Sequence, residues 1–130
     1  MFESYERIME AEPKEIIRAV RRVYLLDHAT FKTGRSRRAS EARITVAGLL
    51  KLQKCTNAQI AKLLHRSQSA IHKMLKRGAW LVEYDEGFRS RLYRAIDWIL
   101  WPDEQRAARY EINEQIKAIL AEQRGCETCG

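Results

Sequence analysis

The chain has 130 residues, with 24 Lys and Arg against 17 Asp and Glu, and a formal net charge of +7. This length predicts one domain that can bury its own core. No apolar run approaches the ~20 residues that span a bilayer, and the acidic start is not typical of a signal peptide. Three cysteines, Cys55, Cys126 and Cys129, make no disulfide framework, so we expect a reducing, cytoplasmic compartment.

The positive charge is concentrated in one part of the sequence. Residues 14–78 hold 16 Lys and Arg and 3 Asp and Glu, a net +13, whereas residues 1–13 and 79–130 each carry a net −3. A concentrated basic field is typical of a surface that binds phosphates, and a generally basic, soluble surface would not explain the segregation. A membrane-surface role would need a basic amphipathic helix with an exposed bulky apolar face, which nothing in the sequence demands.

The first third of the chain predicts two helices and a turn. We expect a short helix over 4–12 and a second helix over 14–27, with Pro13 in its first turn. The second helix places its apolar residues at helical spacing and its arginines largely on the other faces. Residues 28–36 carry His, Thr and Gly, which indicate a turn.

The densest basic run, Arg35 to Arg38, precedes the most apolar segment. Ser40 is the expected cap of a third helix that runs to about Lys54. This segment is apolar over most of its circumference, so we predict that it is the central buried helix of the domain.

Residues 56–77 predict two helices joined by a tight turn. Thr56 and Gln59 match a capping box, and Ser67 is the expected cap of the second helix. At residues 65–66 we expect left-handed backbone, which histidine adopts only at some cost. The spacing predicts a helix-turn-helix, with an ordinary helical hairpin as the alternative. The positions where the two helices should face each other are Ile60, Ala61, Leu64, Ile71 and Met74.

The last third of the chain predicts two further helices. Gly78 is expected to end the preceding helix, and residues 84–87 to form a turn that leads into a helix over 86–100. Pro102 opens a last predicted helix to about Arg124. That helix carries a narrow apolar stripe of Ala108, Ile112, Ile116, Ile119 and Leu120.

No stretch alternates as a strand should, so the sequence predicts an all-α protein, a bundle of about six helices. Residues 1–100 are expected to form the helix-turn-helix domain, with 1–13 as an N-terminal extension. Residues 101–130 are expected to form an extra C-terminal helix and a cysteine-containing tail. The tryptophans are predicted to pack in the core and at helix junctions, rather than to stack on bases: Trp80, Trp98 and Trp101.

Five motifs occur in order along the chain: E-I-I-R-A-V at 15–20, F-K-T-G-R-S-R-R at 31–38, T-N-A-Q-I-A at 56–61, R-S-Q-S-A-I at 66–71 and D-E-G-F at 85–88. They resemble the opening helix, basic loop, S-x-x-E-I-G run, R-D-H-[ST]-T-V signature and D-P-E-L turn of the DNA-binding domain of the bacterial replication initiator DnaA. That domain belongs to the Trp repressor-like helix-turn-helix group. The resemblance covers about two-thirds of the chain.

The chain departs from this family in its signature and in its turn. Three residues keep the chemistry of the signature: Arg66, Ser69 and Ile71. The signature's Asp, His and second Thr are replaced by Ser67, Gln68 and Ala70. That Asp-His-Thr set is what reads the initiator's recognition box, so we do not expect the same target sequence. The turn is one residue shorter than the family's double-glycine turn, and no G-x-x-x-x-G-K-[ST] motif of an ATPase occurs.

A helix-turn-helix places the N-terminal residues of its second helix in the major groove. The residues on that side are Ser67, Gln68, Ser69, His72 and Lys73. Gln68 is the best candidate for base readout, because a Gln amide can pair bidentately with adenine, and a solvated surface amide is the alternative. For His72 the groove and the helix surface are equal alternatives. The residues expected to reach phosphate are Lys73, Lys76 and Arg66.

The basic loop has a second role by resemblance, which is insertion into the minor groove by Arg35, Arg37 and Arg38. A narrow A·T-rich minor groove concentrates negative potential and attracts Arg, and a solvated loop is the alternative. Thr56 and Asn57, at the start of the first motif helix, are candidates to offer backbone N–H groups and side chains to a phosphate.

No catalytic residue, metal site or cofactor is predicted. His28, His65 and His72 are scattered, and no acid pair or nucleophile–base set stands out. Residues 126–129 form a C-x-x-C, but a structural zinc site needs four ligands, so a pair of exposed thiols is the favoured interpretation.

The expected partner is double-stranded DNA, and the expected role is bacterial or phage control of transcription or replication. Alternatives are a packaging protein, such as a small phage terminase-like oligomer, and a protein-interaction module that has lost DNA binding. The C-terminal stripe is a candidate surface for a homodimer or higher oligomer, and packing onto the same domain is its alternative. The residues of that candidate surface are Ile112, Ile116 and Ile119.

Overall fold

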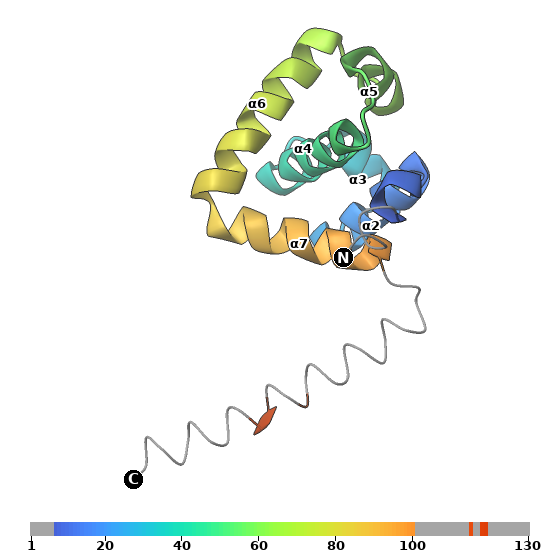
Figure 1. The fold of residues 1–130 in the computed structure, drawn as a ribbon. Coiled ribbons are helices and arrows are strands. Elements are labelled where there is room, and N and C mark those ends of the chain that lie inside the picture. Colours follow the sequence, from blue (N-terminus) through green and yellow to red (C-terminus); the bar gives the residue numbers. More distant parts are fainter. Residues whose placement is uncertain (1–6, 101–114, 116–117, 120–130) are drawn as a thin grey trace. The chain divides into compact units, whose positions relative to one another are not determined.

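The computed structural model of the chain describes residues 7–100, 115 and 118–119 (Figure 1). The chain divides into two compact units, Met1–Leu100 and Trp101–Gly130. Every regular element in the described ranges is an α-helix, which confirms the all-α prediction. The first unit contains a helical turn at residues 7–10, followed by α2 Pro13–Tyr24, α3 His28–Thr33, α4 Arg37–Leu52, α5 Asn57–Leu64, α6 Gln68–Tyr84 and α7 Glu86–Leu100.

Each helix from α3 to α7 begins after a short polar residue. The side chain of that residue accepts a hydrogen bond from the backbone N–H of the third residue of the helix. Such a cap stabilises a helix by about 1 kcal/mol, because it satisfies an N–H that has no partner inside the helix. The capping residues are Asp27, Ser36, Thr56, Ser67 and Asp85. The predicted caps of α5 and α6 are thereby confirmed.

Two helix starts differ from the prediction. The expected turn over 28–36 contains α3, because Asp27 caps this segment and Phe31 buries its side chain in the core. Helix α4 begins after Ser36 and not after Ser40, because the Ser36 hydroxyl provides its cap.

Two helix ends differ as well. Helix α2 ends at Tyr24, earlier than predicted, since Leu25 adopts left-handed backbone with φ 54°. Gly78 does not end α6, which continues to Tyr84. A Cβ atom at Gly78 would lie 2.9 Å from Cγ2 of Ile44 in α4, so this glycine permits a close approach of the two helices.

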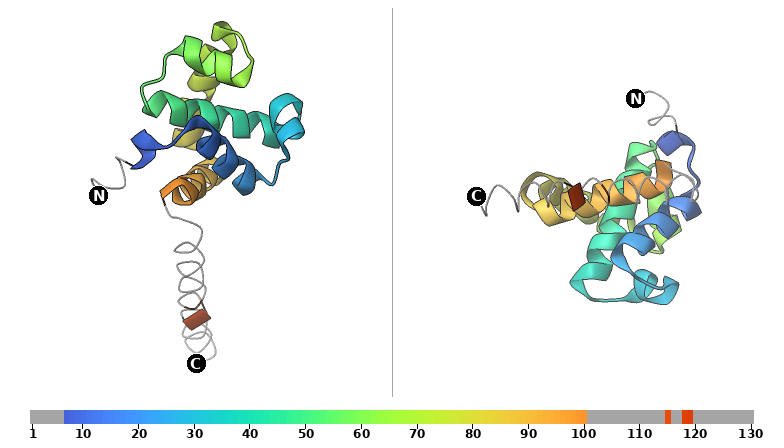
Figure 2. Two further views of the ribbon diagram at one scale, coloured as in Figure 1. Left: turned by 90° about the vertical axis from the view of Figure 1, so that its right-hand side faces the viewer. Right: turned by 90° about the horizontal axis from the view of Figure 1, so that it is seen from below.

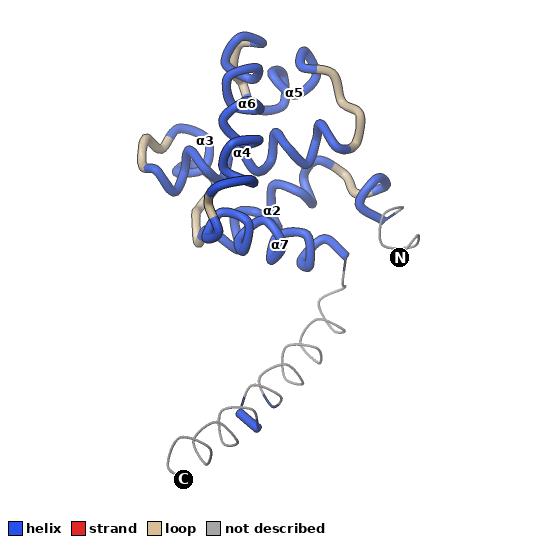
Figure 3. The backbone as a smooth tube through the Cα atoms, turned by 60° about the vertical axis from the view of Figure 1, so that its left-hand side comes forward, coloured by secondary structure: helices blue, strands red, loops and turns tan. Residues whose placement is uncertain are grey.

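Helix α4 is the central helix of the first unit, as predicted. In Figures 2 and 3, α5 and the first turns of α6 lie on one side of α4, and α2 and α7 lie on the other. Helix α4 contacts α2, α3, α5 and α6. Buried side chains occur around most of its circumference: Ala39, Glu41, Ala42, Ile44, Thr45, Val46, Ala47, Leu49 and Leu50.

The second unit is described only at Gln115, Ala118 and Ile119, which are helical and exposed. The rest of the predicted C-terminal helix lies outside the described residues. So do Ile112 and Ile116 of the candidate oligomer surface, and the two cysteines of the tail.

Candidate nucleic-acid interface

Helices α5 and α6 pack through the apolar positions that the sequence predicted. Ile60, Ala61, Leu64 and Ile71 are all buried, and they belong to the main core together with residues of α2, α4 and α7. Met74 is half-buried and packs against the same core. The orientation of α6 is therefore fixed by the core of the unit and not by the α5–α6 turn alone.

The turn between α5 and α6 has the left-handed bend that was predicted. His65 has φ 54° and ψ 46°, and its N–H donates to the carbonyl of Ala61. The N–H of Arg66 donates to the same carbonyl at 3.0 Å. Ser67 then caps α6 by accepting a hydrogen bond from the N–H of Ala70 at 3.1 Å. These bonds close the turn without glycine and compensate the cost of the left-handed histidine.

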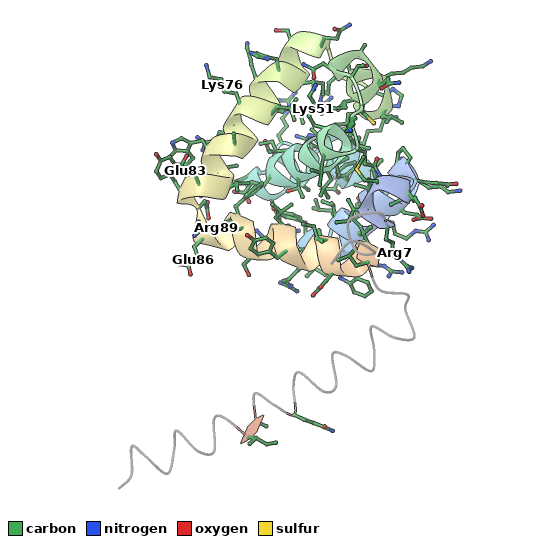
Figure 4. All side chains as sticks on the ribbon, viewed as in Figure 1. Arg7, Lys51, Lys76, Glu83, Glu86 and Arg89 are labelled. Carbon is green, nitrogen blue, oxygen red and sulfur yellow. The ribbon has the colours of Figure 1, made fainter. Side chains whose placement is uncertain are left out.

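The start of α6 presents exposed polar side chains. Gln68, Ser69, His72, Lys73 and Lys76 are all exposed, as is the capping residue before them. Within the described part of the chain, none of these five side chains forms a hydrogen bond or an ion pair. Figure 4 shows Lys76 projecting from α6 on the side away from α4. This face of α6 is therefore free to contact a partner.

Two arginines, one in the α5–α6 turn and one in α4, bind the end of α3. Arg66 donates from Nη2 to the carbonyl of Lys32 at 3.0 Å, and Arg43 donates from Nη1 to the carbonyl of Phe31 at 2.8 Å. These are carbonyls of the last turn of α3, where a cation is favoured. Burial, and then the nearby charge of Arg66, lower the pKa of Arg43 from its ordinary value. Positive charge is therefore gathered where α3, α4 and the α5–α6 turn meet.

The predicted basic loop is divided by the start of α4. Arg35 lies in the loop before the cap, is exposed, and forms no ion pair with another described residue. Arg37 and Arg38 are exposed but belong to the first turn of α4, not to a loop. Arg37 donates to Glu41 at 3.0 Å and to Asp85 at 3.4 Å, which joins α4 to the α6–α7 junction. The expectation that Arg35, Arg37 and Arg38 share one loop is therefore corrected, since α4 begins at Arg37.

Hydrogen bonds within the chain, including the predicted capping box, already occupy the start of α5. The N–H of Thr56 donates to Gln59 at 2.8 Å, and its hydroxyl accepts from the Gln59 N–H at 3.2 Å. The side chain of Asn57 accepts a hydrogen bond from Lys51 at 2.9 Å. The Thr56 N–H is thus not available to a phosphate in this arrangement, whereas Lys51 adds a cation at the same place.

Arg43 and Lys51 belong to this surface but were not predicted from the sequence. The signal for Arg43 was a charged residue among the apolar residues of the most apolar helix of the chain, because a charge that is partly buried requires a specific partner. For Lys51 there was no signal, because its partner Asn57 lies beyond the end of α4.

The described residues contain no group of three or more His, Cys, Asp or Glu side chains that could hold a metal ion. Cys55 is a half-buried free thiol. In the described ranges, no helix is both long enough and apolar enough to cross a membrane.

No protein-family model, curated protein or solved structure matches this chain.

Proposed function

We propose that this chain binds double-stranded DNA sequence-selectively through α5 and α6, which act as a helix-turn-helix. One observation carries the proposal. The first two turns of α6 present exposed, unpaired Gln68, Ser69, His72 and Lys73 on a helix whose opposite face is held by the buried core. A rigid helix with free polar groups at its N-terminal end is the element that enters a major groove.

The charge around this helix pair supports the proposal. Residues 42–82 contain no Asp or Glu. The same segment holds eight cations: Arg43, Lys51, Lys54, Lys62, Arg66, Lys73, Lys76 and Arg77. An uninterrupted basic segment attracts the phosphate backbone, which supplies most of the sequence-independent affinity of a DNA-binding protein. The acidic residues that could repel DNA lie in the segments on either side.

Each side chain has a role that follows from its position. Gln68, in the first turn, is the candidate for hydrogen bonds to adenine in the major groove. Lys73 and Lys76 lie further along the exposed face and contact phosphates. Arg35, in the loop that follows α3, contacts the adjacent backbone or minor groove, because Arg66 holds the end of α3 beside the turn.

The proposed role of this binding is control of transcription or replication in the cytoplasm of a bacterium or in a phage-infected cell. The resemblance of residues 15–100 to the DNA-binding domain of DnaA supports this role. The replaced signature residues predict a target different from the initiator's own recognition box.

The test is selection of binding sites from a random pool of duplexes at two salt concentrations. A selected sequence motif, together with an affinity that falls steeply with salt, would support the proposal. Lys73→Ala should weaken binding, whereas Lys14→Ala, a change of an exposed lysine on α2 that pairs with Glu12, should not. Salt-sensitive binding without a motif would favour a packaging or coating role. Absence of binding at low salt would refute the proposal and favour a protein partner.

A further inference from the structure

The second half of α6 carries an exposed aromatic cluster beyond the residues assigned to DNA. Trp80 is 50 % exposed and Tyr84 is 64 % exposed, and their ring centroids lie 5.2 Å apart. The guanidinium carbon of Arg77 lies 4.9 Å from the centroid of the Trp80 ring. The prediction that Trp80 packs in the core is therefore wrong. Trp, Tyr and Arg are the residues that dominate protein interfaces, and here they are already ordered by contact with one another.

The charged residues on either side of Trp80 have opposite signs, so two copies of α6 can pair them. Arg77 lies three residues before Trp80 and Glu83 lies three residues after it, and all three are exposed on α6. Figure 4 shows Glu83 projecting from α6 on the same side as Lys76. Among the described residues, the Glu83 carboxylate has no hydrogen-bond or ion-pair partner. When two α6 helices cross in antiparallel at Trp80, two-fold symmetry places Arg77 of each copy beside Glu83 of the other.

We propose that Arg77, Trp80, Glu83 and Tyr84, the α6 seam, form the interface with a second copy of this chain. The equal spacing of the opposite charges about Trp80 selects a second copy over an unrelated protein. The two aromatic rings supply the apolar centre of the interface, and the two Arg77–Glu83 pairs fix the antiparallel direction.

The seam leaves the start of α6 free. The first turn of α6, which carries Gln68 and Ser69, is centred about ten positions before Trp80, or about 15 Å along the helix axis, whereas Lys76 lies one turn before Trp80. Two helices that cross at Trp80 therefore carry their first turns about 30 Å apart, close to the spacing of about 34 Å between successive major grooves on one face of a duplex. The inference that the dimer binds two half-sites on DNA rests on the proposed function, whereas the dimer interface itself does not.

The test is the oligomeric state of the full chain without DNA, measured by sedimentation velocity over a dilution series. The wild type should dimerise. Arg77→Glu and Glu83→Arg should each raise the dimer dissociation constant by about tenfold or more, because each places two like-charged pairs in the interface. The double variant R77E/E83R should restore the dimer, since both pairs are then reversed. If the double variant does not recover the dimer affinity that the single variants lose, the proposal is overturned.

Trp80→Ala provides a second measurement, with Tyr93→Ala as its control. Tyr93 is a comparably exposed aromatic residue, at 62 %, on α7 and outside the seam. Trp80→Ala should dissociate the dimer and Tyr93→Ala should not, with unchanged helical circular dichroism for both. A monomeric wild type, or a dimer that survives every seam variant, would overturn the proposal. Dimerisation that behaves as expected in a chain that binds no DNA would refute the proposed function and leave the interface standing.

Discussion

The carboxylate of Glu41 accepts a hydrogen bond from Nη2 of Arg91 at 3.0 Å, which joins the start of α4 to the middle of α7. Glu41 is only 6 % exposed and also accepts a hydrogen bond from Arg37 at 3.0 Å. We expect Glu41→Ala to lower the free energy of unfolding by about 2 kcal/mol, because Arg91 is left partly buried without its carboxylate. Denaturant unfolding measures this change.

Arg37→Ala is the control for that prediction. The Arg37 side chain is 78 % exposed, so its loss should cost less than about 1 kcal/mol. Burial opposes the charge of Arg91, but Tyr24 and Glu41 favour it more, so the pKa of Arg91 is raised. A group with a raised pKa contributes stability that is lost only as the pH rises through that pKa, so the Glu41 effect should persist at neutral pH. If Glu41→Ala and Arg37→Ala lowered the free energy of unfolding equally, the Glu41–Arg91 hydrogen bond would not be the source of the stability.

Asp27 makes the stability of α3 depend on pH. The hydrogen bonds from the backbone and side chain of Thr30 lower the pKa of Asp27 below its ordinary value of 3.8, and the nearby charges of Arg21 and His28 act in the same direction. A lowered pKa contributes stability above the unfolded-state pKa, and this is lost as the pH falls through the folded-state pKa. Asp27→Ala should therefore destabilise the protein at neutral pH, with a difference that shrinks in acid.

Unfolding at neutral pH and well below 3.8 measures this difference. Asp27→Asn is the control, since it keeps a capping oxygen that does not titrate. The difference in free energy of unfolding between Asp27→Asn and Asp27→Ala should be the same at both pH values. If Asp27→Ala lowered the free energy of unfolding equally at both pH values, the charge of Asp27 would contribute nothing to the cap.

Substitution by alanine at two glycines in helix interiors should change the stability of the protein in opposite directions. Gly48 in α4 and Gly78 in α6 both line an apolar groove of about 240 Å³ between α4, α6 and α7. A Cβ at Gly48 meets nothing within 4 Å, so Gly48→Ala should stabilise by about 0.5–1 kcal/mol through helix propensity. A Cβ at Gly78 meets buried Ile44 at 2.9 Å, so Gly78→Ala should destabilise by about 1 kcal/mol through overpacking.

Thermal unfolding of the two variants side by side measures both changes. The pair controls itself, since the chemical change is identical and only the surroundings of the glycine differ. Stabilisation by both variants would mean that α4 and α6 separate without cost, and that Gly78 is not required for their approach.

Local signals predicted the part of the fold that carries the candidate site. The caps at Thr56 and Ser67 and the apolar spacing of Ile60, Leu64 and Ile71 specify α5 and α6 within the sequence itself. Helix α3 was missed because it has only six residues and its propensities are weak. It is stabilised by tertiary contacts of Phe31 with the core, and by arginines that come from α4 and from the α5–α6 turn.

The candidate site was predictable in its helix positions but not in its pairings. Helical period alone placed Gln68 and Lys73 on one exposed face. The pairing of Arg37 with Asp85 joins residues 48 positions apart, so no local pattern could indicate that one basic residue is occupied. Gly78 was interpreted as a helix breaker, because sequence alone does not show that a neighbouring helix needs the space of a missing side chain.

Helix α6 should divide base readout and phosphate contact between Gln68 and Lys76. Gln68→Ala should relax the preference at one position of the selected motif, with a loss of about 1–3 kcal/mol in discrimination, because the bidentate contact to the base is removed. Lys76→Ala should instead weaken binding to all duplexes similarly and reduce the slope of log affinity against log salt by about 1. Titration of the selected duplex and its single-position variants across a salt series measures both effects.

Lys14→Ala on α2 is the control for both substitutions, because it removes an exposed lysine outside the α5–α6 surface. The separation of the two effects is the informative result. A uniform loss for Gln68→Ala, with the preference at every position retained, would show that Gln68 contacts the backbone and not a base. The proposed insertion of α6 would then have to be rotated, so that His72, on the same exposed face, meets the base edges instead.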